Sequence, residues 1–164
     1  MNVSEMVVNR QFLSFILDEE LFALDIAKVR EVMDYTKITR MPRMPEYILG
    51  VINLRGSVVP VIDMRHKFGI GKAEKTVNSC IVIVEVNLDG DNIILGALVD
   101  SVQEVFELEP EHVEPPPKIG IKLDTEFIKG MGKKEEKFII ILDIDRVFST
   151  DDLIMIQDSN DMEK

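Results

Sequence analysis

The chain has 164 residues, which suffices for one domain with a real core or for two small subdomains. Its apolar content of 46% is typical of a folded globular protein, and its longest apolar runs are too short to span a bilayer. The formal net charge of −11 argues against nucleic-acid binding, because phosphate contacts need clustered Lys and Arg side chains.

The N-terminal part of the chain predicts a β-hairpin and then a short helix. Strands are expected at Gln11–Leu17 and Leu21–Leu24, joined by an acidic turn. Asp25 can cap a helix, and apolar residues recur at helical spacing from there to Met33. This pattern predicts a helix over residues 25–33, followed by a loop that contains two prolines.

The stretch VINLRGSVVPVID, Val51 to Asp63, predicts two strands rather than one. Arg55 and Gly56 form the turn between them, since glycine adopts turn conformations at low cost. Pro60 lacks a backbone donor, so the return strand is expected at a sheet edge or with a bulge. Asp63 should then cap a short helix that stops at a glycine.

The rest of the chain predicts more strands, one hairpin, a stiff loop and a last helix. The strands are expected at residues 79–87, 93–99, 102–108, 127–131 and 138–142. Asp89–Gly90 is a strong hairpin signal, and Pro-rich residues 114–118 form the loop. Asp143 should cap a short helix, residues 150–158 form a C-terminal helix, and residues 1–9 and 159–164 are flexible tails.

An internal repeat is the most informative pattern. LFALDIAKVREV, residues 21–32, echoes ILGALVDSVQEV, residues 94–105. An aspartate follows 13 residues after Gly50 and again after Gly130, and a phenylalanine follows five residues after each aspartate. We therefore predict two strand-rich halves, about 11–70 and 79–148, that form two small β-barrels leaning on each other. Between its strands the second half has a charged, featureless turn where the first has the tight Arg-Gly, so Arg55 has no counterpart.

Motifs of enzymes and of metal or cofactor sites are missing from the sequence. The GIGK stretch lacks the Ser or Thr that follows the lysine of a phosphate-binding loop. Phe148 stands where the acidic DIDRVF stretch would need the glycine of a calcium loop. Zinc spacing and a G-x-S-x-G turn are also absent, and Cys80, the single cysteine, is expected to be a buried small hydrophobe in a reducing compartment. We expect a non-enzymatic protein without cofactor or metal.

The stretch GVINLRGSVVPVIDMRHKFG, Gly50 to Gly69, resembles the CheW family of bacterial chemotaxis coupling proteins. The run G-V-x-N-L-R-G-x-x-x-P-V-x-D-x-R-x-x-F is highly specific, and the similarity covers roughly residues 10–150, which we take as a single domain. The resemblance implies a mainly β fold of two SH3-like five-stranded β-barrel subdomains packed together, with short helices and a C-terminal helix.

The resemblance also implies a function. Family members are non-enzymatic adaptors that couple chemoreceptor cytoplasmic tips to the histidine kinase CheA, whose regulatory domain shares the fold. The expected partners are therefore the CheA regulatory domain, the receptor tip and other CheW copies in rings. We expect the protein in the cytoplasm, at membrane-associated receptor arrays, with no direct membrane insertion. The receptor's helical tip would dock in an apolar groove between the barrels, and exposed barrel ends would meet the kinase.

Five residues match family positions that affect coupling, and the resemblance implies that they bind partners: Val29, Glu31, Gly50, Arg55 and Gly56. Other roles compete for some of them. Val29 lies on an apolar face and can be core, while Gly50 and Glu31 have duplicates in the second half that suggest a structural role. Two alternatives to the adaptor remain. One is a small-ligand-binding β-barrel protein with a polar cleft between the barrels. The other is a CheW-like module of a larger signalling protein, and the chain length of 164 residues argues against it.

Overall fold

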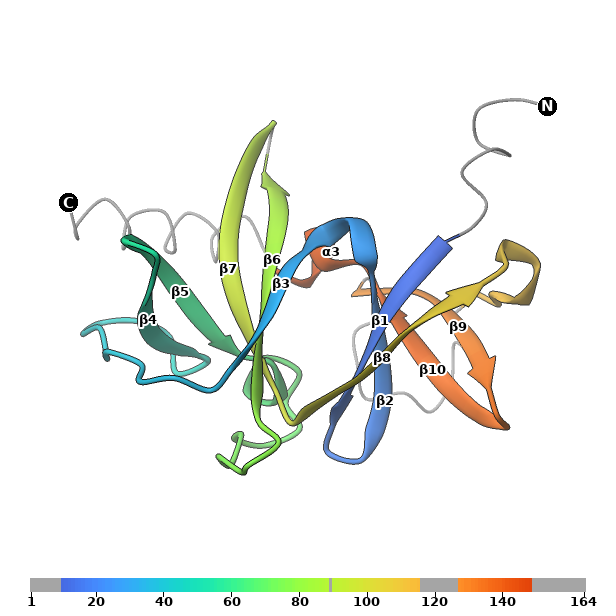
Figure 1. Ribbon diagram of the computed structural model, residues 1–164, viewed down its shortest axis with the longest axis horizontal. Coiled ribbons are helices and arrows are strands. Elements are labelled where there is room, and N and C mark those ends of the chain that lie inside the picture. Colours follow the sequence, from blue (N-terminus) through green and yellow to red (C-terminus); the bar gives the residue numbers. More distant parts are fainter. Residues whose placement is uncertain (1–9, 89, 116–126, 149–164) are drawn as a thin grey trace.

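The computed structural model describes residues 10–88, 90–115 and 127–148 (Figure 1). In chain order the strands are β1 (Arg10–Leu17), β2 (Glu20–Asp25), β3 (Val29–Asp34), β4 (Ile48–Leu54), β5 (Ser57–Asp63), β6 (Cys80–Leu88), β7 (Asp91–Val99), β8 (Ser101–Leu108), β9 (Ile128–Lys134) and β10 (Lys137–Leu142). The helical segments are η1 (Ile26–Lys28), α2 (Met64–Lys67), η2 (Pro110–His112) and α3 (Ile144–Val147). Within the described ranges, no helix has the length and apolarity needed to cross a membrane.

The strands form two five-stranded sheets, which we call the first and second barrels. The first barrel has the order β8-β1-β2-β10-β9, and the second has the order β3-β6-β7-β5-β4. In each sheet, a residue that follows one edge strand pairs with the other edge strand: Thr39 after β3 with β4, and Glu114 after β8 with β9. The two edges of each sheet are thereby drawn together, as in a barrel. Thr39 and Val51 exchange two backbone hydrogen bonds of 2.8 Å, and Glu114 and Met131 exchange bonds of 2.8 and 2.7 Å. The predicted mainly β class with two SH3-like barrels is confirmed.

Each barrel takes strands from both halves of the chain. The hairpin β1–β2 joins β8, β9 and β10, while the hairpin β6–β7 joins β3, β4 and β5. Two parallel pairs close this exchange, β10 with β2 and β5 with β7, and they use equivalent registers. The expectation that each half of the repeat forms its own barrel is therefore wrong. Neither half contains a complete sheet, so the two must fold together.

The predicted helix over residues 25–33 is also wrong. Asp25 does act as a cap, accepting a 2.9 Å hydrogen bond from the Ala27 backbone at Oδ1, but only the three residues of η1 come after it. From Val29 the chain runs as β3, antiparallel to β6. The apolar spacing fits a helix, but this segment pairs along a long buried strand, and that tertiary pairing outweighs the local pattern.

The other local predictions largely hold. Asp63 caps α2 and Asp143 caps α3, each accepting a 3.2 Å bond from a backbone N–H in the following turn. The predicted strands and the loop around residues 41–47 are present, whereas the C-terminal helix and both tails lie outside the described residues. The expected edge position of Pro60 is wrong, because β5 lies between β7 and β4. Pairing with β7 covers only Val61–Asp63, so the missing donor of Pro60 falls beyond it.

Three hairpins share one turn geometry. The two central residues have positive φ in each: Asp18 and Glu19 between β1 and β2, Arg55 and Gly56 between β4 and β5, and Glu135 and Glu136 between β9 and β10. Positive φ at both positions matches the twist of paired strands. The predicted contrast between a tight turn in the first half and a featureless one in the second is therefore wrong, since both are two-residue turns.

Apolar side chains divide into three buried clusters. One fills the second barrel around Ile81 and Ile83, and another fills the first barrel around Phe12 and Ile139. The largest cluster lies at the junction and draws on both sheets, from Phe15 of β1 to many residues of β6 and β7. The barrels therefore share a core, which satisfies the expectation that neither could bury enough surface alone.

Candidate partner-binding surface

Four repeat-related valines border the junction of the two barrels. Val29 and Val32 lie on β3, and their equivalents Val102 and Val105 lie on β8; both are edge strands. Val29 and Val102 pack partly buried against the shared core. Val32 and Val105 are 41% and 50% exposed, far more than the buried valines of the core. We call these four residues the valine seam; in Figure 1, β3 lies at the boundary between the barrels, and β8 starts at this boundary and crosses the first barrel.

The seam is anchored through its cross-strand neighbours. Val29 pairs with Val84 and Val32 with Val82 on β6, while Val102 and Val105 pair with β1. Val82 and Val84 are completely buried. The side chains beneath the seam on β6 are therefore packed, and the four valines form an apolar rim at the junction where the apolar groove is expected. The seam itself is apolar, whereas the small-ligand alternative requires a polar-lined cleft between the barrels.

Arg55 and Glu31 form an ion pair beside the seam. Arg55 Nη2 lies 3.1 Å from Glu31 Oε2, with side-chain exposures of 75% and 30%. Arg55 occupies the first central position of the β4–β5 turn at a φ of 49°, and the Gly56 backbone donates a 2.7 Å bond to Asn53 Oδ1. The turn therefore holds the guanidinium out toward solvent while β3 supplies its acid.

The five predicted site residues separate into two groups. Glu31, Arg55 and Gly56 come together, because the β4–β5 turn that contains Gly56 places Arg55 against Glu31 of β3. Val29 lies on the same strand as Glu31, but it packs against the shared core. Gly50 does not join them, because it is buried, and a Cβ there would lie 2.1 Å from the Thr39 carbonyl oxygen. Its absence of a side chain lets the chain after β3 bridge to β4, which favours the structural role suggested by the duplicate at Gly130.

The repeat also gives Arg55 an equivalent that sequence comparison did not find. Glu135 occupies the same turn position between β9 and β10, at a φ of 50°. The turn geometry therefore does not require an arginine, and the charge is opposite in the second half. Beside Arg55, a second ion pair joins Arg30 of β3 to Glu85 of β6 at 2.6 Å. Guanidinium groups therefore flank the β3 side of the seam.

Three of the four seam valines were missed by sequence reasoning. The signal was present in the repeated V-x-E-V pattern, which places Val32 and Val105 at matching positions. Because the spacing predicts a helix in the first copy, Val32 falls outside the apolar face of that helix. Val32 and Val105 are recognised as exposed equivalents once both segments are known to be edge strands, because a residue of an edge strand can lie on an accessible face.

Ion pairs between the barrels fix their relative position. Arg65 of α2 lies 3.2 Å from Asp18 in the β1–β2 turn and 3.6 Å from Asp100, which links β7 to β8. Lys28 of η1 bonds Asp145 of α3 at 2.8 Å. The buried atoms Arg65 Nε and Asp100 Oδ1 have no hydrogen-bond partner in the described structure. Polar side chains therefore tie the barrels together around the apolar junction.

An exposed trio of potential metal ligands lies at η2. The ligand atoms of Glu109, Glu111 and His112 all lie within 4.8 Å of one another. A hydrogen bond that the protonated Glu109 donates to Glu111, together with the negative charge of Glu111, raises the pKa of Glu109 above its usual value. Surface carboxylates commonly cluster without binding a metal, and nothing else at this place points to a ligand.

Comparison with known proteins agrees with the fold. The family model described as "CheW-like domain" matches residues 11–152. Chemotaxis protein CheW of Klebsiella aerogenes is 37% identical over 152 residues, which cover 91% of this chain and 87% of that protein. Probable chemotaxis protein CheW of Rhizobium etli is 32% identical over 141 residues, which cover 86% of this chain and 88% of that protein.

A solved structure gives the same result. The crystal structure of the scaffolding protein TtCheW from Thermoanaerobacter tengcongensis aligns with a TM-score of 0.78 at 41% sequence identity. The alignment covers 88% of this chain and 90% of that chain. The similarity therefore includes both barrels and the segments that connect them. The chain belongs to the family of CheW-like domains.

Proposed function

We propose that the protein is a non-enzymatic chemotaxis adaptor that couples chemoreceptor cytoplasmic tips to the histidine kinase CheA. The observation that carries this proposal is the valine seam beside an exposed Arg55–Glu31 pair. It supplies an apolar rim and a polar anchor on the same edge. The protein acts in the cytoplasm, where receptor arrays meet the membrane.

The seam is suited to the apolar face of a helical receptor tip. Fully burying a valine contributes roughly 1.5–2 kcal/mol, so covering the half-exposed Val32 and Val105 contributes about 1 kcal/mol each. Contacts this small give a weak individual interface. Many weak interfaces in a receptor array reinforce one another through effective concentration.

Arg55 is suited to fix the register of the docked helix. Only one of its terminal nitrogens bonds Glu31, so further donors of the planar fork are available to a receptor carboxylate or carbonyl. Glu31 restricts the motion of the guanidinium and so lowers the entropy lost on binding. Gly56 supports this arrangement by stabilising the turn that carries Arg55.

The kinase would meet the ends of the barrels rather than the seam. The regulatory domain of CheA is expected to have the same two-barrel fold. A barrel of the adaptor can therefore pack on a barrel of the regulatory domain, and the two proteins can alternate in rings. Further copies of the adaptor can take the place of the regulatory domain in such a ring. Such interfaces need only modest area because the ring supplies several of them. Receptor and kinase then bind separate surfaces of one rigid body.

Receptor-dependent stimulation of CheA tests the role of Arg55. We expect Arg55→Ala to leave thermal unfolding nearly unchanged, because the side chain is 75% exposed, and to weaken both stimulation and co-sedimentation with a receptor fragment. Arg43→Ala is the matched control, since Arg43 is also exposed and also has positive φ. Full stimulation by Arg55→Ala at unchanged stability would refute the role.

A second pair of variants tests the seam directly. Val32→Ser with Val105→Ser should weaken receptor co-sedimentation about thirtyfold, the effect of losing roughly 2 kcal/mol of binding free energy. Val77→Ser is the control, because that valine is completely exposed and far from both edge strands in sequence. If the control and the double variant bind the receptor equally well, the seam is not the docking surface.

A further inference from the structure

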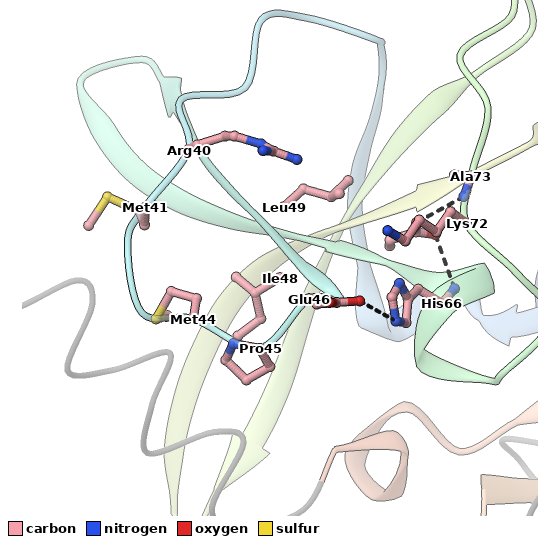
Figure 2. A pocket seen from close by; sticks show the side chains of 11 residues that line it. Arg40, Met41, Met44, Pro45, Glu46, Ile48, Leu49, His66, Lys72 and Ala73 are labelled. Carbon is pink, nitrogen blue, oxygen red and sulfur yellow. Dashed lines mark hydrogen bonds and ion pairs between the residues drawn. The ribbon is translucent and has the colours of Figure 1, made fainter.

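A cavity of about 510 Å³ lies beside β4 and α2, away from the valine seam. Its apolar surface includes Met41, Met44 and Leu49, and its charged residues include Arg40 and Lys72 (Figure 2). The volume falls within the range of ligand pockets, and the lining is more polar than apolar. None of its lining residues belongs to the five predicted site residues or to the seam.

Two cations enter the cavity from different segments. Figure 2 shows Arg40 extending from the loop after β3 and Lys72 from the loop after α2, with both charged ends directed toward the space over Leu49. Within residues 10–88, 90–115 and 127–148, neither side chain forms a hydrogen bond or an ion pair. Like charges that converge repel one another, and an anion placed between them relieves that repulsion. This arrangement is notable in a chain with 30 acidic and 19 basic residues.

Two acids, Glu46 and Asp63, also line the cavity. Glu46 lies 3.6 Å from His66 Nε2 on the rim. Asp63 is only 1% exposed and uses both oxygens, accepting a 3.2 Å bond from the His66 backbone and a 2.9 Å bond from the Ala73 backbone. The buried carboxylate therefore holds the wall that carries Lys72, and its oxygens are directed at backbone donors rather than at the two cations.

This clamp is a feature of the first half of the repeat. The equivalent Asp143 accepts from the Asp145 backbone at Oδ1, and its Oδ2 lies 3.6 Å from Arg146 Nε. Among the described residues it holds no second loop. The connection from Asp63 to Ala73 thus goes beyond the helix cap that both halves share, and it positions one wall of the cavity.

We propose that this cavity binds a carboxylate carried on an apolar stem. Arg40 and Lys72 pair with the carboxylate by charge-assisted hydrogen bonds, and the stem packs on the methionines and Leu49. Methionine side chains adapt their shape, so the floor accepts stems of different form. The carboxylate comes from a segment of a partner protein or from a free small acid, since the chemistry is the same. The site is independent of the receptor-docking role.

Titration of the full chain with defined probes tests the proposal. The probes are acetyl-Leu-Glu-Leu-amide as the peptide source, glutarate as the free acid, and acetyl-Leu-Gln-Leu-amide as the neutral control. Backbone ¹H–¹⁵N signals of His66 and Ala73 report on the wall next to Lys72. We expect saturable shifts with at least one acidic probe in the millimolar range and at least tenfold weaker binding of the neutral peptide.

Matched variants connect any binding to the two cations. Arg40→Gln with Lys72→Gln should weaken binding at least tenfold, while Lys129→Gln, at an exposed position of β9, should leave it unchanged. All three positions are exposed, so the spectra of the variants should otherwise match the wild type. Tighter binding of the peptide identifies a protein segment as the source, and binding of glutarate at least as tight identifies a small acid. Absence of saturation with both acidic probes, equal binding of the neutral peptide, or unchanged binding by the double variant would overturn the proposal.

Discussion

Replacing Gly50 with alanine should destabilise the protein rather than remove a partner contact. A Cβ at this position would lie 2.1 Å from the Thr39 carbonyl oxygen, 2.7 Å from its carbonyl carbon and 3.0 Å from Arg40 Cα. All three are backbone atoms and cannot swing aside as a side-chain end can. Gly50 also has a φ of 148°, which an alanine adopts only with strain.

The magnitude depends on the groups that must move. Thr39 and Val51 exchange two backbone hydrogen bonds of 2.8 Å, and pushing Thr39 away breaks both. Each bond contributes about 1 kcal/mol, and the unfavourable φ adds about 1–2 kcal/mol. The expected loss is therefore about 3–4 kcal/mol in the free energy of unfolding, equivalent to a fall in Tm of roughly 10 °C for a chain of this size.

Urea unfolding followed by circular dichroism measures this loss, with two glycines for comparison. Gly56→Ala should cost only about 1 kcal/mol, because its φ is 89° but its Cβ meets nothing within 4 Å. Gly130→Ala should fall between the two, since its nearest neighbour at 2.4 Å is a methyl group of Val113, which can move. A Gly50→Ala variant with unchanged stability but impaired kinase stimulation would refute the reasoning and make Gly50 a contact residue.

Three further outcomes are expected. Arg65→Met should lower the free energy of unfolding, measured by urea titration, by about 1–2 kcal/mol, because it removes the cation beside the mostly buried Asp100. The double variant Arg65→Met, Asp100→Asn should recover part of this loss. Burial lowers the pKa of Lys67 below its ordinary 10.5, so just below pH 10.5 the unfolded state binds more protons than the folded state. The free energy of unfolding should therefore rise with pH in that range, and Lys67→Met should abolish this rise. An identical pH dependence in both proteins would contradict the prediction. Glu111→Ala should lower the pKa of Glu109 in a carboxyl ¹³C NMR titration, because it removes both the hydrogen-bond acceptor and the negative charge that raise this pKa. An unchanged pKa would rule out this cause.

The difference between sequence and structure is clearest at β3. Asp25 was correctly identified as a cap, because capping depends on one side chain and the next few backbone groups. The conformation of the chain after this cap depends on a partner strand more than 45 residues away in sequence, since Val29 pairs with Val84. The spacing of apolar residues within the segment does not depend on β6, so it could not predict the strand pairing. The helix prediction therefore failed, and Val32 was overlooked.

The candidate surface divides along the same line. Arg55 was singled out from its place in an apolar run and from its lack of a repeat. Its ion pair with Glu31, 24 residues earlier, and the reversal to Glu135 at the equivalent turn emerge only when the barrels are formed. The cavity of Arg40 and Lys72 likewise has no sequence signature, because its walls come from two separate loops.

By itself, the sequence determined the described strands other than β3, the turns, the three aspartate caps and the existence of a duplicated unit, because each depends on residues close in the chain. Tertiary structure alone decided that the two halves exchange hairpins, so that each barrel contains strands of both. The reason is physical: a hairpin has two apolar faces to bury, and nothing in its own residues specifies which three strands will cover them. That choice is made by the packing of the whole chain around the shared junction, against which Val29 of β3 and Val102 of β8 both pack.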